Sequence, residues 1–92
     1  MIDTEKLVLL DFTAPWCNPC KAQLPILEAL QEEYKDILEI RKVNIDEQTE
    51  LASQYSIRSV PTMVFLKNGE MMDMTVGLTT KKALSEKVLR YC

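Results

Sequence analysis

The sequence predicts an α/β fold with a four-stranded mixed sheet and helices on both of its faces. Strand-like and helix-like segments alternate in the order β-α-β-α-β-β-α. The first two strands are separated by a helix, so they need a crossover connection and pair in parallel. The last two strands flank Asn68-Gly69, a dipeptide that strongly favours a tight hairpin turn. We therefore expect residues 1–92 to form a single domain.

The first predicted strand, residues 7–12, is apolar at odd and even positions alike, as is typical of a strand covered on both faces. Residues 13–20 form a loop that leads into an amphipathic helix over residues 21–34. Its apolar positions recur at steps of three and four residues: Leu27, Leu30 and Tyr34. Its polar residues lie mostly elsewhere: Gln23, Glu28, Gln31, Glu32 and Lys35. Pro25 should kink this helix.

The second strand, residues 38–43, alternates between apolar and polar residues and is expected to be half exposed. Its charged residues suit the edge of a sheet, where charge discourages pairing with another chain: Glu39, Arg41 and Lys42. Asp46 is the expected N-cap of a short helix that ends at Tyr55.

The rest of the chain predicts the hairpin and a final helix. Its strands cover residues 62–67 and 70–76. Gly77 ends the second of these strands, and Thr79 or Thr80 can cap the last helix. The residues of that helix expected to face the core are Leu84, Val88 and Leu89.

Composition excludes several classes of protein. Of 92 residues, 47% are hydrophobic and 27% are charged, which is an ordinary balance for a globular domain. A net charge of −3 argues against a nucleic-acid or anionic-membrane surface. No apolar run approaches the length of a membrane span, and the first residues lack the apolar stretch of a secretory signal. We therefore expect a cytoplasmic protein.

The chain has no histidine and three cysteines. Without histidine, Cys-His and Ser-His catalysis is excluded. Cys17 and Cys20 are close in sequence and Cys92 is remote, so the pattern is not a disulfide framework. It indicates either a local redox pair or half of a metal site, together with one spare thiol.

Trp16-Cys17-Asn18-Pro19-Cys20 lies where the first helix begins. Two intervening residues in a first helical turn bring the sulfurs of Cys17 and Cys20 close enough to form a disulfide. Unpaired N–H groups and the positive end of the helix dipole favour the Cys17 thiolate, the form that attacks disulfides. Cys20, one turn further in, is expected to be less exposed and to be the resolving thiol. Pro19 suits a first helical position.

Two metal-binding alternatives compete with the redox pair. Zinc normally takes four Cys or His ligands, and here only Cys92 could assist the pair. A [2Fe–2S] centre shared by two chains would instead take four thiolates from two Cys-x-x-Cys pairs.

Several further motifs occur in a characteristic order. Asp-Phe precedes Trp-Cys-x-Pro-Cys-Lys, and Asn-Ile-Asp, Ile-Arg-x-Val-Pro-Thr and Lys-Asn-Gly-Glu follow it. With these motifs the chain resembles the thioredoxin family from about Leu7 to its end. The family's usual first strand and first helix are absent, so it looks like a short, glutaredoxin-sized thioredoxin. Asn18 stands where the commonest family sequence has glycine, and Thr13 where an aromatic residue is frequent.

The resemblance assigns roles near the dithiol. Asp11 matches the family's buried aspartate, whose desolvation would raise its pKa and make it a proton acceptor for Cys20. The alternative is a hydrated carboxylate at a strand end. Lys42 matches the lysine beside that aspartate, although the sequence alone would equally make it a solvated edge lysine. Pro25 matches a helix-kinking proline with a structural role.

The resemblance also implies a substrate surface. Trp16 is expected to be partly exposed and to contact substrates, rather than to pack in the core. Val60-Pro61-Thr62 looks like the family's cis-proline loop, where the Val60 backbone would pair with an extended substrate segment. Gly77 would complete this rim, or it would only end a strand.

Together these residues predict a thiol–disulfide oxidoreductase that reduces protein disulfides. No bound cofactor is needed, because both electrons reside on the sulfurs. The expected partners are proteins that contain disulfides and an electron donor similar to thioredoxin reductase, and the chain is expected to be a monomer. A cluster-binding scaffold and a redox-silent interaction module remain alternatives. Cys92 is interpreted as an incidental thiol.

Overall fold

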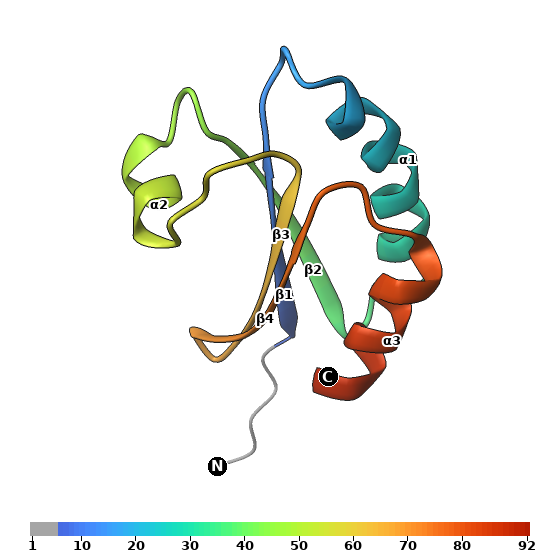
Figure 1. The fold of residues 1–92 in the computed structure, drawn as a ribbon. Coiled ribbons are helices and arrows are strands. Elements are labelled where there is room, and N and C mark those ends of the chain that lie inside the picture. The colour runs from blue at the N-terminus through green and yellow to red at the C-terminus, as the bar shows by residue number, and fades with distance from the viewer. Residues whose placement is uncertain (1–5) are drawn as a thin grey trace.

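The computed structural model describes residues 6–92, which form a central sheet between two layers of helices (Figure 1). The elements are β1 (Leu7–Thr13), α1 (Asn18–Glu33), β2 (Leu38–Asn44), α2 (Thr49–Gln54), β3 (Thr62–Lys67), β4 (Glu70–Val76) and α3 (Lys81–Tyr91). The sheet has the strand order β2-β1-β3-β4. β1 runs parallel to β2, and the other pairs are antiparallel. The predicted α/β fold and its mixed sheet are confirmed.

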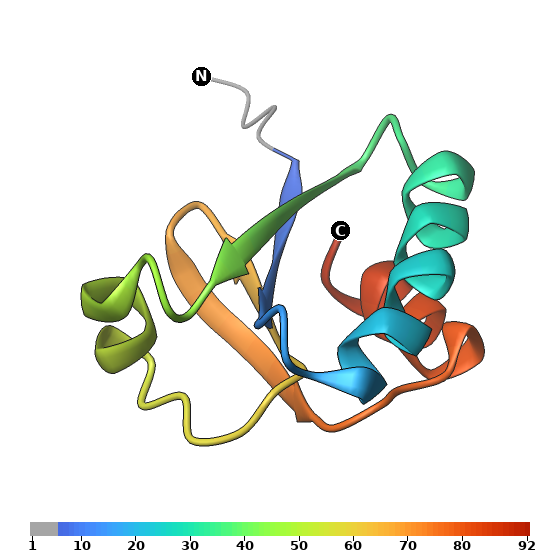
Figure 2. The same ribbon diagram turned by 90° about the horizontal axis from the view of Figure 1, so that it is seen from above.

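Helices cover both faces of the sheet, as Figures 1 and 2 show. α1 and α3 pack on one face, to which β1 contributes the buried side chains of Leu7 and Leu9. α2 packs on the other face, to which β1 contributes Leu10 and Phe12. The predicted two-sided burial of this strand is therefore confirmed. Because both faces of β1 are buried, its position is fixed. The C-terminal end of β1 leads directly to the dithiol.

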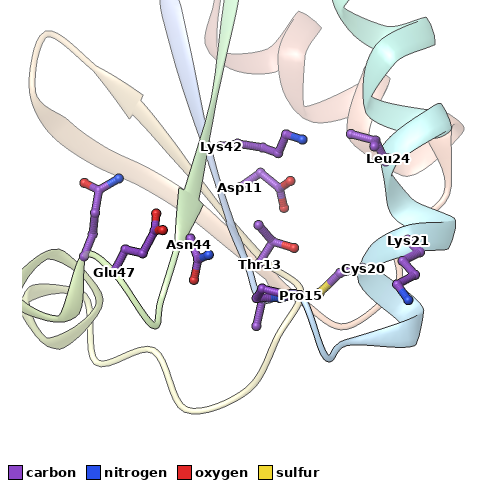
Figure 3. A pocket seen from close by; sticks show the side chains of 11 residues that line it. Asp11, Thr13, Pro15, Cys20, Lys21, Leu24, Lys42, Asn44 and Glu47 are labelled. Atoms are coloured by element: carbon purple, nitrogen blue, oxygen red, sulfur yellow. The ribbon is translucent and has the colours of Figure 1, made fainter.

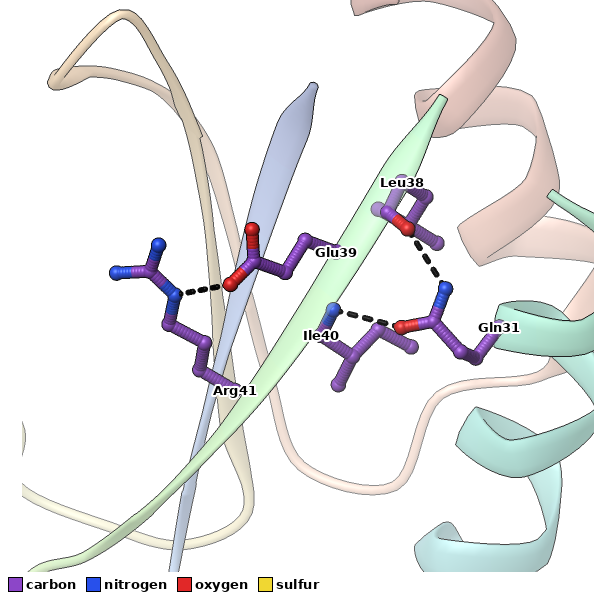
Figure 4. Close-up of polar contacts among 5 residues, drawn as sticks. All are labelled: Gln31, Leu38, Glu39, Ile40 and Arg41. Carbon is purple, nitrogen blue, oxygen red and sulfur yellow. Dashed lines mark hydrogen bonds and ion pairs between the residues drawn. The ribbon is translucent and has the colours of Figure 1, made fainter. Parts of the chain in front are cut away.

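β2 is an edge strand, as its charges predict, and a glutamine from α1 occupies part of that edge (Figure 4). The Nε2 atom of Gln31 donates to the carbonyl oxygen of Leu38 at 2.6 Å, and its Oε1 atom accepts from the Ile40 N–H at 2.8 Å. One carboxamide thus pairs two backbone groups that an adjacent strand would otherwise pair. This contact holds the middle of α1 against the sheet.

The hairpin between β3 and β4 follows its sequence signal. Asn68 and Gly69 both have positive φ, at 54° and 81°. Positive φ at both central residues is what a two-residue turn of this handedness requires, and asparagine and glycine adopt it most readily.

The first helix includes the dithiol, as predicted. α1 begins at Asn18 with Cys17 as its N-cap, so the amphipathic pattern from residue 21 covers only its later turns. The helix continues through Pro25 to Glu33. The dithiol therefore spans the cap and the first turn of the helix.

Two expectations about the later helices are wrong. α2 begins at Thr49 with Gln48 at its N-cap, and no side chain caps it. Asp46 lies instead in the preceding turn, where its N–H donates to Oδ1 of Asn44 at 2.8 Å. Leu89 is 62% exposed because it points away from the buried face of α3, which Leu84 and Val88 share. Of the two predicted caps of α3, Thr79 and Thr80, it is Thr80 that caps the helix, and its hydroxyl accepts from the Ala83 N–H.

Candidate active site

The dithiol lies at the N-terminal end of α1. Cys17 and Cys20 form a disulfide, and their Cα atoms are 5.3 Å apart. The Sγ atom of Cys17 accepts a hydrogen bond from the Cys20 N–H at 3.1 Å. When the disulfide is reduced, this donor and the positive end of the helix dipole stabilise negative charge on Cys17.

Both cysteines are buried to a similar degree. Cys17 is 4% exposed and Cys20 is 7% exposed, so the expectation that Cys20 is the less exposed of the two is wrong. Ala14, Ile45 and Val60 pack against the pair, and Cys17 is buried. Access to its sulfur therefore depends on the loops around it.

One of these loops carries Pro61. The Val60–Pro61 peptide bond is cis, as the resemblance implies. The carbonyl oxygen of Val60 lies 3.6 Å from Sγ of Cys17. The carbonyl oxygen of Pro61 accepts from the Gly77 N–H at 2.8 Å. The fold thus brings the dithiol, the proline loop and Gly77 together, although they are far apart in sequence.

Gly77 follows β4 directly and has a φ of 87°. Side chains disfavour this backbone conformation, so glycine is needed here for its backbone and not only to end a strand. The neighbouring Val76 is 66% exposed and adds an apolar side chain to the rim.

Trp16 lies beside the dithiol and is 66% exposed, so the alternative of a core tryptophan is wrong. Its Nε1 atom donates to Oδ2 of Asp46 at 3.0 Å. Asp46 is a site residue that the sequence analysis assigned elsewhere, as a helix cap. The hydrogen bond restricts how the indole ring can turn while leaving the ring uncovered.

Asp11 and Lys42 lie behind the dithiol and face each other across the paired strands β1 and β2. Asp11 is 4% exposed, and its Oδ1 atom has no hydrogen-bond partner. Burial raises the pKa of its carboxyl from 3.8 to about 6, and the charge of Lys42 opposes part of that rise. The alternative of a hydrated carboxylate at a strand end is wrong.

A cavity of about 370 Å³ connects this acid to the dithiol. Figure 3 shows that Asp11, Lys42 and Cys20 all line it, together with Lys21 of α1. The carboxyl of Asp11 and the sulfur of Cys20 therefore open onto one space that is large enough to hold water.

Gln23 is a second residue that the sequence analysis placed wrongly. It was expected on the polar side of α1, yet none of it is exposed. Its spacing from Cys20, Leu27 and Leu30 puts it on the buried face of the helix. That spacing is the signal that could have located it.

Three findings concern the part of the chain that the structure describes. Within residues 6–92, no group of three or more Cys, Asp or Glu side chains is arranged to hold a metal ion. Cys92 lies at the C-terminal end of α3, away from the start of α1 (Figure 1). None of the helices in this range has the length and apolar character that a membrane span requires.

Comparison with known proteins agrees with the fold and the site described above. Residues 1–90 fit the sequence profile of the family described as Thioredoxin. The chain is 46% identical over 88 residues to the thioredoxin of Bacillus subtilis, a match that covers 96% of this chain and 85% of that relative. The chain belongs to the thioredoxin family. This thioredoxin-family protein is accordingly a thiol–disulfide oxidoreductase, with its disulfide between Cys17 and Cys20.

Other relatives and solved structures agree. The chain is 46% identical over 91 residues to the chloroplastic M-type thioredoxin of Pisum sativum, which matches 99% of this chain. The chain spans only 53% of that relative's length. A mutant thioredoxin of Halobacterium salinarum has a TM-score of 0.89 at 38% identity, covering 95% of this chain and 75% of that one. Fasciola hepatica thioredoxin has a TM-score of 0.88 at 36% identity, with coverages of 97% and 84%. The thioredoxin fold is therefore confirmed.

Proposed function

We propose that this protein reduces protein disulfides with Cys17 as the attacking sulfur and Cys20 as the resolving sulfur. The observation that carries the proposal is the asymmetry of the pair. Sγ of Cys17 accepts the Cys20 N–H at the helix N-terminus and adjoins the proline loop. Cys20 instead lines the cavity that contains Asp11. One sulfur is therefore set up to hold negative charge, and the other to give up a proton.

The reaction has two exchange steps. The Cys17 thiolate attacks one sulfur of the substrate disulfide, that S–S bond breaks, and the other substrate sulfur leaves as a thiolate. Asp11 then accepts the proton of the Cys20 thiol, and the Cys20 thiolate attacks Sγ of Cys17. The mixed disulfide breaks, the Cys17–Cys20 disulfide forms and the second substrate thiolate departs. Two electrons pass from the dithiol to the substrate, so no cofactor is required.

Asp11 suits this role because a general base works best with a pKa near the working pH. Burial raises the pKa of its carboxyl to about 6, close to neutrality. The positive charge of Lys42 limits that rise and keeps the carboxylate available to accept a proton.

We further propose that a substrate binds as an extended segment across the loops around Cys17. Trp16 and Val76 offer exposed apolar side chains on this surface. The Val60 carbonyl lies beside the attacking sulfur, and the neighbouring backbones of Pro61 and Gly77 are hydrogen-bonded to each other. Main-chain pairing would give affinity for many sequences, and the apolar side chains would select among them.

The proposed electron donor and cellular compartment follow from the redox chemistry of the dithiol. The oxidised pair has to be reduced again, so we propose an electron-donating protein similar to thioredoxin reductase and a reducing compartment such as the cytoplasm. We also propose that residues 1–92 act as one functional unit and as a monomer. The exposed thiol of Cys92 takes no part in the reaction.

The test is disulfide reduction by single-cysteine variants, with insulin as substrate and dithiothreitol as the recycling reductant. Cys17→Ser should abolish reduction. Reduced Cys20→Ser, mixed with insulin after the dithiothreitol has been removed, should accumulate a mixed disulfide visible on a non-reducing gel. Cys92→Ser is the matched control and should behave as wild type. Activity of Cys17→Ser, or absence of the trapped species with Cys20→Ser, would contradict the assignment. A reduction potential far more oxidising than the glutathione couple would instead indicate a disulfide-forming enzyme.

A further inference from the structure

A fully buried glutamine lies one helical turn beyond the dithiol. Gln23 follows Cys20 on the buried face of α1, next to Leu27, and none of it is exposed. Burying a carboxamide costs free energy unless its donor and its acceptor both find partners. The partners of Gln23 therefore show what the residue does.

Both ends of this carboxamide bond to the same residue in the loop between β4 and α3. Nε2 of Gln23 donates to the carbonyl oxygen of Thr79 at 3.0 Å. Oε1 of Gln23 accepts from the Thr79 N–H at 2.8 Å. The side chain pairs with the Thr79 backbone much as a neighbouring strand would, and ties that loop to the dithiol helix.

The same loop carries Gly77. The hydroxyl of Thr79 donates to the carbonyl oxygen of Gly77 at 2.9 Å. The Gly77 N–H donates to the carbonyl oxygen of Pro61 at 2.8 Å. A continuous chain of hydrogen bonds thus links α1, the Gly77 loop and the proline loop. On its outer side this loop exposes Val76 and Leu78, at 66% and 55%.

We propose that Gln23 is a positioning residue that fixes the Gly77 loop relative to the dithiol, so that an extended polypeptide can lie along it. This inference rests on the proposed function, because it takes the backbone at Pro61 and Gly77 as the place where a substrate segment lies. A loop held in place before binding need not be ordered by the substrate, which strengthens binding. A small disulfide that touches only the sulfurs gains nothing from it. Gln23 therefore favours polypeptide disulfides over small ones.

The test replaces Gln23 with methionine, which is also unbranched and of similar length but cannot make either hydrogen bond. The net contribution of one hydrogen bond corresponds to about a five-fold change in affinity, so losing the contact that positions the loop should weaken the binding of a polypeptide substrate by about that factor. Gln23→Met should raise KM for insulin by about five-fold or more while kcat is unchanged. Its rate with cystamine, a small disulfide, should stay at the wild-type value.

Gln31→Met is the matched control. It removes the same kind of carboxamide from the same helix, where it also pairs with two backbone groups, but at the β2 edge. It should leave KM for insulin unchanged. The proposal is overturned if Gln23→Met does not raise this KM, or if Gln31→Met raises it equally.

Amide hydrogen exchange supplies a test that needs no assay of turnover. In the wild-type protein the Thr79 and Gly77 amides should be protected despite lying in a loop, and Gln23→Met should expose both to faster exchange. Fast exchange of the Thr79 amide in the wild type would overturn the proposal even if the variant does not fold. A wild-type protein that reduces neither insulin nor cystamine, but protects Thr79, would refute the proposed function while the positioning contact stands.

Discussion

Replacement of Asp11 by asparagine should stabilise the protein above about pH 6. The two side chains have the same shape, but asparagine carries no charge. Burial raises the pKa of Asp11 from 3.8 to about 6, so the folded protein disfavours the carboxylate. Because the carboxyl pKa is higher in the folded state, Asp11 costs the fold no stability below about pH 3.8. The free energy of unfolding then decreases as the pH rises through about 6.

The magnitude follows from the two pKa values. A rise from 3.8 to about 6 corresponds to about 3 kcal/mol of lost stability once Asp11 is fully ionised. About half of this loss is already present near pH 5, because Asp11 is then ionised in the unfolded chain but protonated in the fold. The asparagine variant avoids the loss, although its buried amide also needs partners and reduces the gain.

The assay is urea unfolding of the oxidised protein, in which neither Cys17 nor Cys20 titrates. The stability gained by Asp11→Asn should increase by about 1.5 kcal/mol between about pH 5 and pH 8. Asp36→Asn, at an exposed carboxylate, is the control and should show no comparable trend. A gain that does not change with pH, or a variant less stable than wild type at pH 8, would refute the reasoning. In the reduced protein the same variant should prolong the mixed disulfide, because in the proposed mechanism the resolving thiol loses its base.

Two further predictions concern neighbours of the dithiol. Lys42→Met should raise the pKa of Asp11 above about 6, because it removes the positive charge that opposes the effect of burial. The assay is an NMR titration of the Asp11 carboxyl, and a lower or unchanged pKa would contradict this prediction. Asp46→Ala should lower the fluorescence anisotropy of Trp16 by releasing its indole N–H, and should cost less than about 1 kcal/mol of stability because the contact is exposed. Unchanged anisotropy would show that the hydrogen bond does not hold the ring.

The fold could be predicted because its determinants are local. The strand from Leu7 is apolar on both sides, and the structure buries it between two helical layers. Asn68-Gly69 specifies its turn through backbone conformations that few other residues adopt. Once a crossover and a hairpin are assigned, few sheet topologies remain. Errors arose where a side chain made a contact other than the expected local one, as when Asp46 bonded Trp16 and did not cap α2.

The chemistry of the site could be predicted in part. The spacing of Cys17 and Cys20 predicts a redox pair or half of a metal site at the start of a helix, and only the resemblance to the thioredoxin family favours a buried carboxyl at Asp11 over a hydrated one. The contacts that Asp46 and Gln23 make could not be predicted in this way, because they join residues far apart in the sequence. Asp46 has the local signature of a helix cap, but the indole of Trp16, thirty positions earlier, takes its carboxylate. Gln23 binds Thr79 across 56 positions.

These long-range contacts divide the site into two parts with different sensitivity to substitution. In the proposed mechanism, proton and electron transfer depend on Cys17, Cys20 and Asp11, which adjoin one cavity or one helical turn. The segments proposed to contact a substrate are instead held by Gln23 and by Asp46, through hydrogen bonds that reach none of the reacting sulfurs. Substitutions at these two residues should therefore change which disulfides are reduced while leaving the exchange chemistry intact.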